Sequence, residues 1–323
     1  MGNWCDYKVT TDEKIYPLLL KPVIKDYLWG GTRLIDEYGF ETDKNPAAEG
    51  WMLSCHKDGT NIVVNGEYKG KSLDEVLKNW YGDYSLPILI KLIDAKDRLS
   101  VQVHPDNEYA LKNEGEPGKT EMWYIVDCEP GAELIYGFTK EVSKDEFAER
   151  INKNTLDAVM NYVPVKKGDV FFIKSGTLHA IGKGILIAEI QQNSNTTYRV
   201  SDYGRLGADG KPRELHVKKA LDVTETRPST IPYGNIGEIE KHSFGIKRHL
   251  AKCEYFDVTY YDLSGKVDLT SNDCFSSLLV IEGKIDIEYN NGTVSAGKGD
   301  SLFIPKGLKV TVSGTAKIIL SEF

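Results

Sequence analysis

The sequence has few cysteines and no long hydrophobic run, and both features narrow the class of protein. The five cysteines of the 323-residue chain are scattered, odd in number and without a CxxC pair. This spacing argues against a disulfide framework and a cysteine-ligated zinc site, so we expect reduced thiols. Pro87 and Lys91 break the most apolar segment, and charges from Asp6 to Lys14 interrupt the first residues. We therefore expect neither a signal peptide nor a membrane span, and a cytoplasmic location.

An excess of positive charge is also lacking. The formal net charge is −8 at pH 7 and the isoelectric point is about 5.4. The negatively charged phosphate backbone of nucleic acids binds best to a basic protein surface. The net negative charge of this chain therefore disfavours a nucleic-acid partner. An anionic small molecule stays compatible with it, provided that lysines and arginines gather locally around the binding site.

Short β-branched and aromatic runs, separated by Gly, Asn, Asp and Pro, make up most of the chain and predict a mainly β fold of antiparallel sandwiches or barrels. Helical patterns are few. Capping boxes that begin at Ser72 and Ser143 predict helices near residues 72–82 and 143–160, and a short helical turn is expected after Pro105. At 36.2 kDa, the chain is long enough for two domains. Turn residues near 228–234 predict the boundary, with domains at 1–231 and 232–323.

An internal repeat links the two predicted domains. From Gly168-Asp169 onward the sequence matches the segment that begins at Gly299-Asp300, and each copy predicts a tight turn, a strand, a second turn and a return strand. Val310 stands where the first copy has His179. Since the second copy does without the histidine, we interpret His179 as functional rather than structural, and histidine is the commonest metal ligand.

Four side chains that can ligate a metal, Gln102, His104, Glu121 and His179, lie where strands could bring them together. Gln102 and His104 are two residues apart, so on a strand they project to one face while the valines beside them pack the other way. Two imidazoles, one carboxylate and one amide oxygen suit zinc at a site with an open position. We expect one divalent ion per chain, with iron, manganese and cobalt as alternatives.

The Gly-Asp turn with a histidine ten residues after the aspartate resembles the second motif of the cupin superfamily. Gln102-x-His104 departs from the usual His-x-His of cupins and points to one family. Four ordered segments, at residues 99–106, 118–124, 176–180 and 198–205, resemble the short bacterial form of the type I mannose-6-phosphate isomerases. The resemblance implies two cupin-type β-barrel (jelly-roll) domains with a small helical addition, the C-terminal barrel being degenerate and without metal ligands.

The resemblance also implies roles for individual residues. The zinc ligands would be Gln102, His104, Glu121 and His179. Catalytic roles would fall to Arg199, Glu189 and Lys119, with Glu189 as the acid/base group. Lys91, Ser100 and Arg205 would bind substrate, the last two near its phosphate. Many family members have Glu-Ser-Trp-Glu where this chain has Glu49-Gly-Trp-Met, so no role is transferred to that segment.

The function implied is interconversion of mannose 6-phosphate and fructose 6-phosphate through an enediol. This chemistry requires a base, an electrophile that stabilises the developing oxyanion, and groups that bind the phosphate. A base such as Glu189 would suit it if burial raises its pKa toward neutrality. The alternatives are a non-catalytic sugar-phosphate-binding cupin, an isomerase of another aldose phosphate and an iron-dependent oxygenase. The expected partner is a small sugar phosphate, and the oligomeric state stays open.

Overall fold

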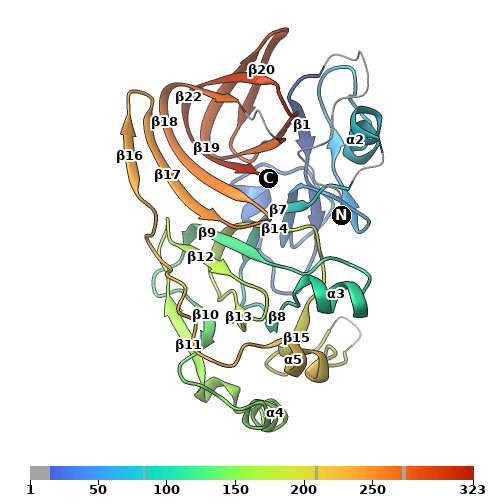
Figure 1. The fold of residues 1–323 in the computed structure, drawn as a ribbon, viewed down its shortest axis with the longest axis vertical. Helices are drawn as coiled ribbons and strands as arrows, with labels where there is room; N and C mark the ends of the chain where they lie inside the picture. The colour runs from blue at the N-terminus through green and yellow to red at the C-terminus, as the bar shows by residue number, and fades with distance from the viewer. Residues whose placement is uncertain (1–14, 83–84, 208–209, 271–273) are drawn as a thin grey trace.

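Antiparallel β-sheets dominate the computed structural model, which describes residues 15–82, 85–207, 210–270 and 274–323 (Figure 1). The predicted mainly β fold is confirmed. The strands form sheets of nine, six and five strands and a two-stranded sheet of β4 (Cys55–His56) and β5 (Gly59–Thr60). In the described part of the chain, no helix has both the length and the apolar character that crossing a bilayer requires.

The six- and five-stranded sheets face each other and enclose the candidate site. The first has the order β12-β9-β14-β7-β3-β2, with strands β2 (Val23–Lys25), β3 (Glu49–Leu53), β7 (Ile88–Ala95), β9 (Glu121–Cys128), β12 (Val170–Ile173) and β14 (Ile185–Gln192). The second has the order β11-β10-β13-β8-β15, with strands β8 (Val101–Val103), β10 (Glu133–Phe138), β11 (Met160–Pro164), β13 (His179–Ala180) and β15 (Tyr198–Ser201). Trp123 of β9 lies edge-on to His179 of β13, with 5.3 Å between ring centroids, so the facing surfaces are in contact.

The nine-stranded sheet is built mainly by the C-terminal part of the chain, drawn in orange and red in Figure 1. Its strands are β1 (Leu18–Lys21), β6 (Ile62–Val63), β16 (Ile239–His242), β17 (Gly245–Lys252), β18 (Asp257–Thr270), β19 (Ser276–Tyr289), β20 (Gly292–Gly297), β21 (Ser301–Ile304) and β22 (Lys309–Glu322). Leu18 of β1 pairs with Phe303 of β21, so the first described strand joins this C-terminal sheet. The domain boundary at 231/232 stays a prediction. Strands β1 and β6 precede this boundary in the sequence but belong to the sheet that is built mainly from residues after it.

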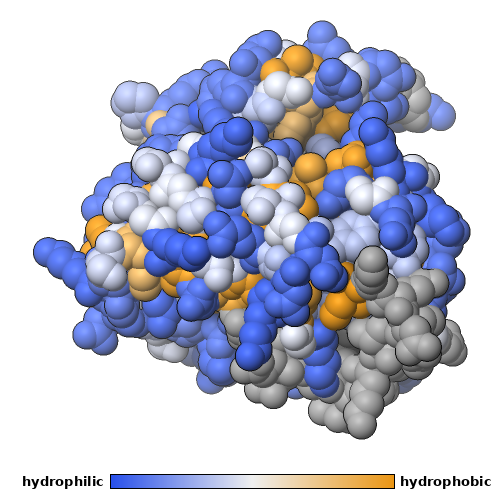
Figure 2. Space-filling view, turned by 90° about the horizontal axis from the view of Figure 1, so that it is seen from above, coloured by the Kyte–Doolittle hydropathy of each residue, from blue (hydrophilic) through white to orange (hydrophobic). Residues whose placement is uncertain are grey.

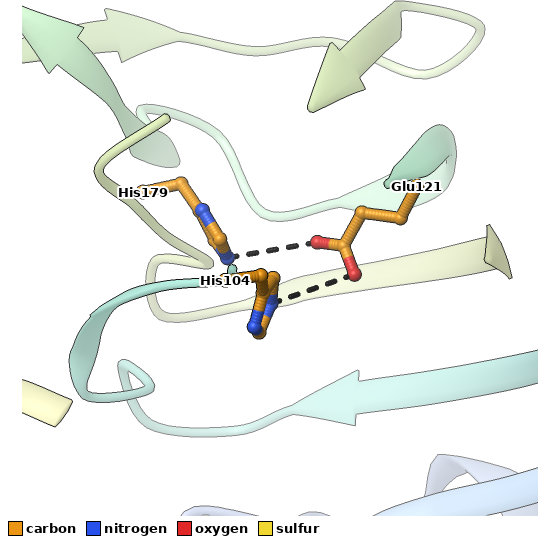
Figure 3. Close-up of side chains that lie close together, drawn as sticks. All are labelled: His104, Glu121 and His179. Carbon is orange, nitrogen blue, oxygen red and sulfur yellow. Dashed lines mark ion pairs between the residues drawn. The ribbon is translucent and has the colours of Figure 1, made fainter. Parts of the chain in front are cut away.

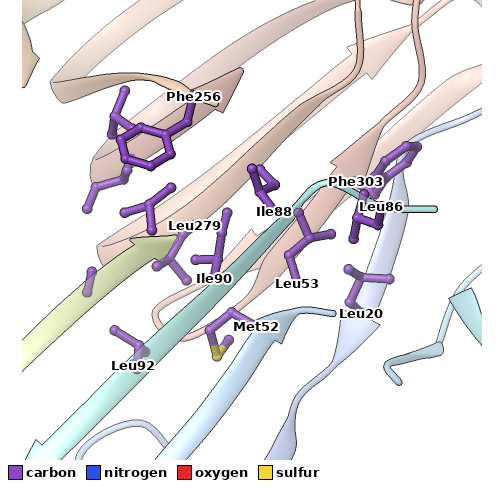
Figure 4. Packing of buried hydrophobic residues seen from close by; sticks show 14 of the residues in the cluster. Leu20, Met52, Leu53, Leu86, Ile88, Ile90, Leu92, Phe256, Leu279 and Phe303 are labelled. Atoms are coloured by element: carbon purple, nitrogen blue, oxygen red, sulfur yellow. The ribbon is translucent and has the colours of Figure 1, made fainter. Parts of the chain in front are cut away.

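The six-stranded sheet is covered on both faces. Its inner face meets the five-stranded sheet, while the other packs against the nine-stranded sheet through a shared hydrophobic core (Figure 4). In that core Ile88 and Ile90 of β7 lie among Phe256, Leu279 and Phe303. Every residue of β7 is therefore buried, as expected for a strand covered on both sides. Figure 2 shows an outer face where hydrophilic residues predominate and hydrophobic ones form smaller patches.

The helices lie at the edges of the sheets: α1 (Arg33–Asp36), α2 (Leu73–Tyr81), α3 (Asn107–Asn113), α4 (Lys144–Asn152) and α5 (Val217–Val223). The hydroxyl of Ser72 accepts the Glu75 amide and caps α2, and Ser143 caps α4 in the same way. The helix predicted over 143–160 is shorter than expected. The helix α4 ends at Asn152, Asn154 then takes a left-handed φ of 53° that prevents the helix from continuing, and a 3-10 turn (Leu156–Ala158) follows before β11.

The internal repeat appears in both barrels. Gly168 and Gly299 turn with φ of 89° and 87°, and the strands that follow are β12 and β21. These positive angles favour glycine and explain why both copies carry it. His179 points into the site between the facing sheets, whereas Val310 is buried in the hydrophobic core of the nine-stranded sheet.

Candidate metal and substrate site

Three of the four expected metal ligands converge between the facing sheets (Figure 3). His104 Nε2 lies 3.7 Å from Glu121 Oε2, and His179 Nε2 lies 3.6 Å from Glu121 Oε1. One ligand atom from each residue falls within 4.8 Å of the other two, and all three side chains are buried. Elsewhere in the described part of the chain no second group of His, Cys, Asp or Glu has this arrangement.

Backbone carbonyls orient both imidazoles. His104 Nδ1 lies 2.9 Å from the carbonyl of Thr196, and His179 Nδ1 lies 2.8 Å from that of Thr177. A carbonyl only accepts, so each Nδ1 carries the proton and each Nε2 presents its lone pair to the site. Burial lowers the pKa of His104 well below its ordinary value and lowers that of His179 to about 4. Both rings are therefore neutral near pH 7, the form that binds a metal.

Gln102, the fourth expected ligand, lies beside His179. The two residues pair directly across β8 and β13, and the Gln102 amide approaches His179 Nε2 at 3.4 Å. The oxygen and nitrogen of an amide are interchangeable by rotation, so the oxygen can face the same point. All four expected ligands are thus brought to one place.

The donor atoms fit a cation. His104 Nε2 and both carboxylate oxygens of Glu121 are buried and make no well-aligned hydrogen bond, although Lys119 Nζ lies 2.9 Å from Glu121 Oε2. Burial first, and then the neighbouring Glu189, raise the pKa of Glu121 to about 7. Buried polar atoms without partners are costly, and a divalent ion among them would satisfy all of them at once. The set suits a nitrogen- and oxygen-ligated divalent metal.

A second buried carboxylate, Glu189, lies next to the ligands. Glu189 pairs with Lys91 of β7 and with Trp123 of β9, so the three side chains form a row across the sheet. The Trp123 indole donates to Glu189 Oε2 at 2.9 Å, while Lys91 Nζ lies 3.3 Å and Lys119 Nζ 3.8 Å from Glu189 Oε1. Burial alone would raise the pKa of Glu189, but Lys119 and Lys91 reverse the effect and lower it. The condition of a pKa raised by burial is therefore not met, and Glu189 is a carboxylate at neutral pH.

Some of these groups line one small cavity of about 190 Å³, whose wall includes Gln102 but not His104, Glu121 or His179. Six of the expected site residues lie on its wall: Lys91, Ser100, Gln102, Lys119, Glu189 and Arg199. Arg205 does not line it. Its guanidinium donates to Asp202 Oδ1 and to the carbonyl of Arg98, each at 2.6 Å.

Two charged residues on the cavity wall were not expected from the sequence. Glu49 Oε2 accepts the Trp51 indole at 2.8 Å and lies 3.5 Å from Lys91 Nζ, and Arg213 belongs to the same wall. The sequence does contain a pattern that could have indicated Glu49. It lies two residues before Trp51, and residues two apart on a strand project to the same face. Arg213 lies outside the strands, where no periodicity marks its position.

Comparison with known proteins identifies the family. The sequence model of the phosphomannose isomerase type I catalytic domain matches residues 18–146, and that of the mannose-6-phosphate isomerase cupin domain matches residues 246–323. The mannose-6-phosphate isomerase ManA of Bacillus subtilis is 42% identical, over 95% of this chain and 98% of its own length. The mannose-6-phosphate isomerase of Streptococcus mutans is 38% identical over the same shares. A crystal structure of mannose 6-phosphate isomerase from Bacillus subtilis matches with a TM-score of 0.87 and 38% identity, covering 95% of this chain and 99% of that chain. The chain therefore belongs to the type I mannose-6-phosphate isomerase family.

Proposed function

We propose that the protein interconverts mannose 6-phosphate and fructose 6-phosphate, with one zinc ion per chain held by Gln102, His104, Glu121 and His179. The observation that carries the proposal is the buried His104, Glu121 and His179 cluster, which lies next to a cavity lined by Glu189 and several cations. The names of the relatives support the choice of substrate. Two imidazoles, a carboxylate and an amide support zinc, with iron, manganese and cobalt to be separated by experiment.

Glu189 is the proposed proton carrier. Isomerisation moves a proton between C2 and C1, and a carboxylate that is ionised at neutral pH can accept it from one carbon and return it to the other. The Trp123 indole holds Oε2 and leaves Oε1 as the oxygen that reaches the substrate. A metal bound beside it would polarise the substrate oxygens as a Lewis acid.

Lys119 and Arg199 are the proposed electrophilic groups. Lys119 Nζ sits between Glu121 and Glu189, so it is placed to donate to a substrate oxygen next to the reacting carbons. Arg199 pairs with Gln102 across β8 and β15, so it lies on the cavity wall between the expected metal ligands and Arg213, within reach of the middle of a bound sugar. In a small cavity with buried walls, such cations stabilise an enediolate more strongly than they would in water.

Substrate binding is assigned to Lys91 and Ser100 on the cavity wall. Lys91 is held between Glu49 and Glu189, so it also fixes the position of the proton carrier. Arg205 acts near the phosphate through Asp202, to which it donates. We also propose a cytoplasmic location, which the four described cysteines support because all are free thiols.

The test is conversion of mannose 6-phosphate to fructose 6-phosphate by the purified protein, before and after chelation and after restoring zinc, iron, manganese or cobalt singly. Activity that is lost on chelation and best restored by zinc is expected. A His179→Ala variant should be inactive, while His242→Ala, which removes a partly exposed histidine of β16, should be fully active. A folded, metal-loaded protein with no turnover would indicate a binding protein, and turnover only with another aldose phosphate would reassign the substrate.

A further inference from the structure

The positive charges of the cavity fall into two groups. Lys91 and Lys119 at the metal end each have carboxylate partners, with nitrogen-to-oxygen distances of 2.9 to 3.8 Å. Arg199 on the same wall has none within the described part of the chain. Its Nη1 donates to the carbonyl of Glu214 at 2.9 Å, and its Nε is buried without a hydrogen-bond partner. This end of the cavity therefore carries uncompensated positive charge.

Arg213 adds a second guanidinium at this end. Its Nε and Nη2 donate to the two oxygens of Asp202 at 2.7 and 2.6 Å, a fork that fixes the group and leaves Nη1 outside the pair. Burial, followed by repulsion from Arg213, lowers the pKa of Arg199. An anion between the two guanidinium groups would relieve this repulsion and give the buried Nε of Arg199 an acceptor.

The position of the pair along the cavity matches the shape of a hexose 6-phosphate. His179, Gln102 and Arg199 lie in a row across neighbouring strands, and the cavity wall runs from Gln102, the expected metal ligand beside His179, to the two arginines. The reacting carbons C1 and C2 and the phosphate on C6 stand at opposite ends of an open-chain sugar. With C1 and C2 beside Glu189, the phosphate reaches the arginine end. Planar guanidinium groups match the geometry of phosphate oxygens.

We infer that Arg213, held in place by Asp202, binds the substrate phosphate together with Arg199. This inference rests on the proposed function. Arg205, which the family resemblance places near the phosphate, has a different role: it does not line the cavity, and its guanidinium donates to Asp202 Oδ1, the oxygen that also accepts from Arg213 Nη2. Arg213 is therefore a binding residue and Arg205 a positioning residue.

Steady-state kinetics of Arg213→Gln test the inference. Losing charge-assisted hydrogen bonds should raise KM for mannose 6-phosphate roughly 10- to 100-fold, with a much smaller change in kcat. Inorganic phosphate should inhibit the wild-type protein competitively and the variant weakly. Arg213→Lys, which keeps the charge, should recover part of the loss, and Arg205→Gln should raise KM less than Arg213→Gln. Unchanged KM and phosphate inhibition in Arg213→Gln, or a larger effect of Arg205→Gln, would overturn the inference.

Calorimetric titration with inorganic phosphate separates this inference from the proposed function, because it needs no turnover. If the wild-type protein fails to isomerise mannose 6-phosphate, the proposed function fails. Phosphate binding that Arg213→Gln weakens and Arg213→Lys partly restores would still support the arginine site. Equal phosphate affinity in the wild-type protein and a folded Arg213→Gln variant would reject it, whatever the activity.

Discussion

Replacing Lys91 by methionine tests how the cavity keeps its carboxylates charged. Lys91 Nζ lies 3.5 Å from Glu49 Oε2 and 3.3 Å from Glu189 Oε1, and its side chain is only 4% exposed. Trp51 and Trp123 each hold one of these carboxylates through an indole N–H. Methionine retains most of the packing volume and removes the charge, so both carboxylates stay in place without their shared cation.

The expected cost is large, because breaking a buried ion pair by removing one partner destabilises a protein by about 3–5 kcal/mol. The total stability of a folded protein is about 5–15 kcal/mol. The cost should also depend on pH. The lysines lower the pKa of Glu189 in the folded protein, so this carboxylate adds stability above its unfolded pKa of about 4.3 and loses it as pH falls through the lower folded value. In the variant, Lys91 no longer opposes the effect of burial. The pKa of Glu189 is therefore higher than in the wild-type protein, and the variant takes up a proton more readily. Its deficit should therefore shrink on going from about pH 7 to about pH 5.

Urea unfolding of the metal-loaded proteins at the two pH values measures the deficit. Lys96→Met, which removes an exposed lysine just after β7, is the matched control and should cost little. The double variant Lys91→Met with Glu49→Gln removes the charge of Glu49, which has lost Lys91 as its ion-pair partner, and should recover part of the stability. A deficit below about 1 kcal/mol near pH 7, or one that does not change with pH, would refute the reasoning.

His179→Ala should lose both metal and turnover, whereas Arg199→Ala should keep its metal and lose most turnover; metal analysis beside rates distinguishes them, and equal metal loss would contradict the division of roles. Gly168→Ala should cost about 1–2 kcal/mol in unfolding free energy, because φ is 89° and a Cβ there meets open space, leaving backbone strain as the whole cost. A fragment that ends at residue 235 should be insoluble because it uncovers one apolar face of the six-stranded sheet; a soluble, metal-binding fragment would contradict this.

The four candidate metal ligands were predictable from residue type and spacing, whereas the roles of Lys91 and Glu189 were implied by the family resemblance. Lys91 and Glu189 stand within β7 and β14, whose other residues are mostly apolar, and such buried charges need partners. They turn out to pair with each other across the two strands. The sequence could not supply the sign of the Glu189 pKa shift, because burial and the lysines act in opposite directions and only their distances decide which effect is larger.

What the sequence could not predict depends on contacts between distant segments. Arg213 reaches the cavity from a loop, where neither period 2 nor period 3.6 marks which side chain points inward. Leu18 pairs with Phe303, and no local pattern specifies a partner so far along the chain. The helical spacing of apolar residues near 143–160 continued past Asn154, although the backbone there turns left-handed and the α-helix had already ended at Asn152.

The second barrel contributes to the site although it lacks the histidine. Strands β7, β9 and β14 carry Lys91, Glu121 and Glu189 on one face, while the other face carries apolar side chains into the core shared with the nine-stranded sheet. Cavity charges attract and repel strongly because the surroundings are dry, so their positions must be fixed against these forces. A sheet covered on one face only would expose its apolar surface and lose that rigidity. The C-terminal nine-stranded sheet therefore supports the strands that carry the site, and this support depends on its apolar residues, which include Val310 in place of a ligand.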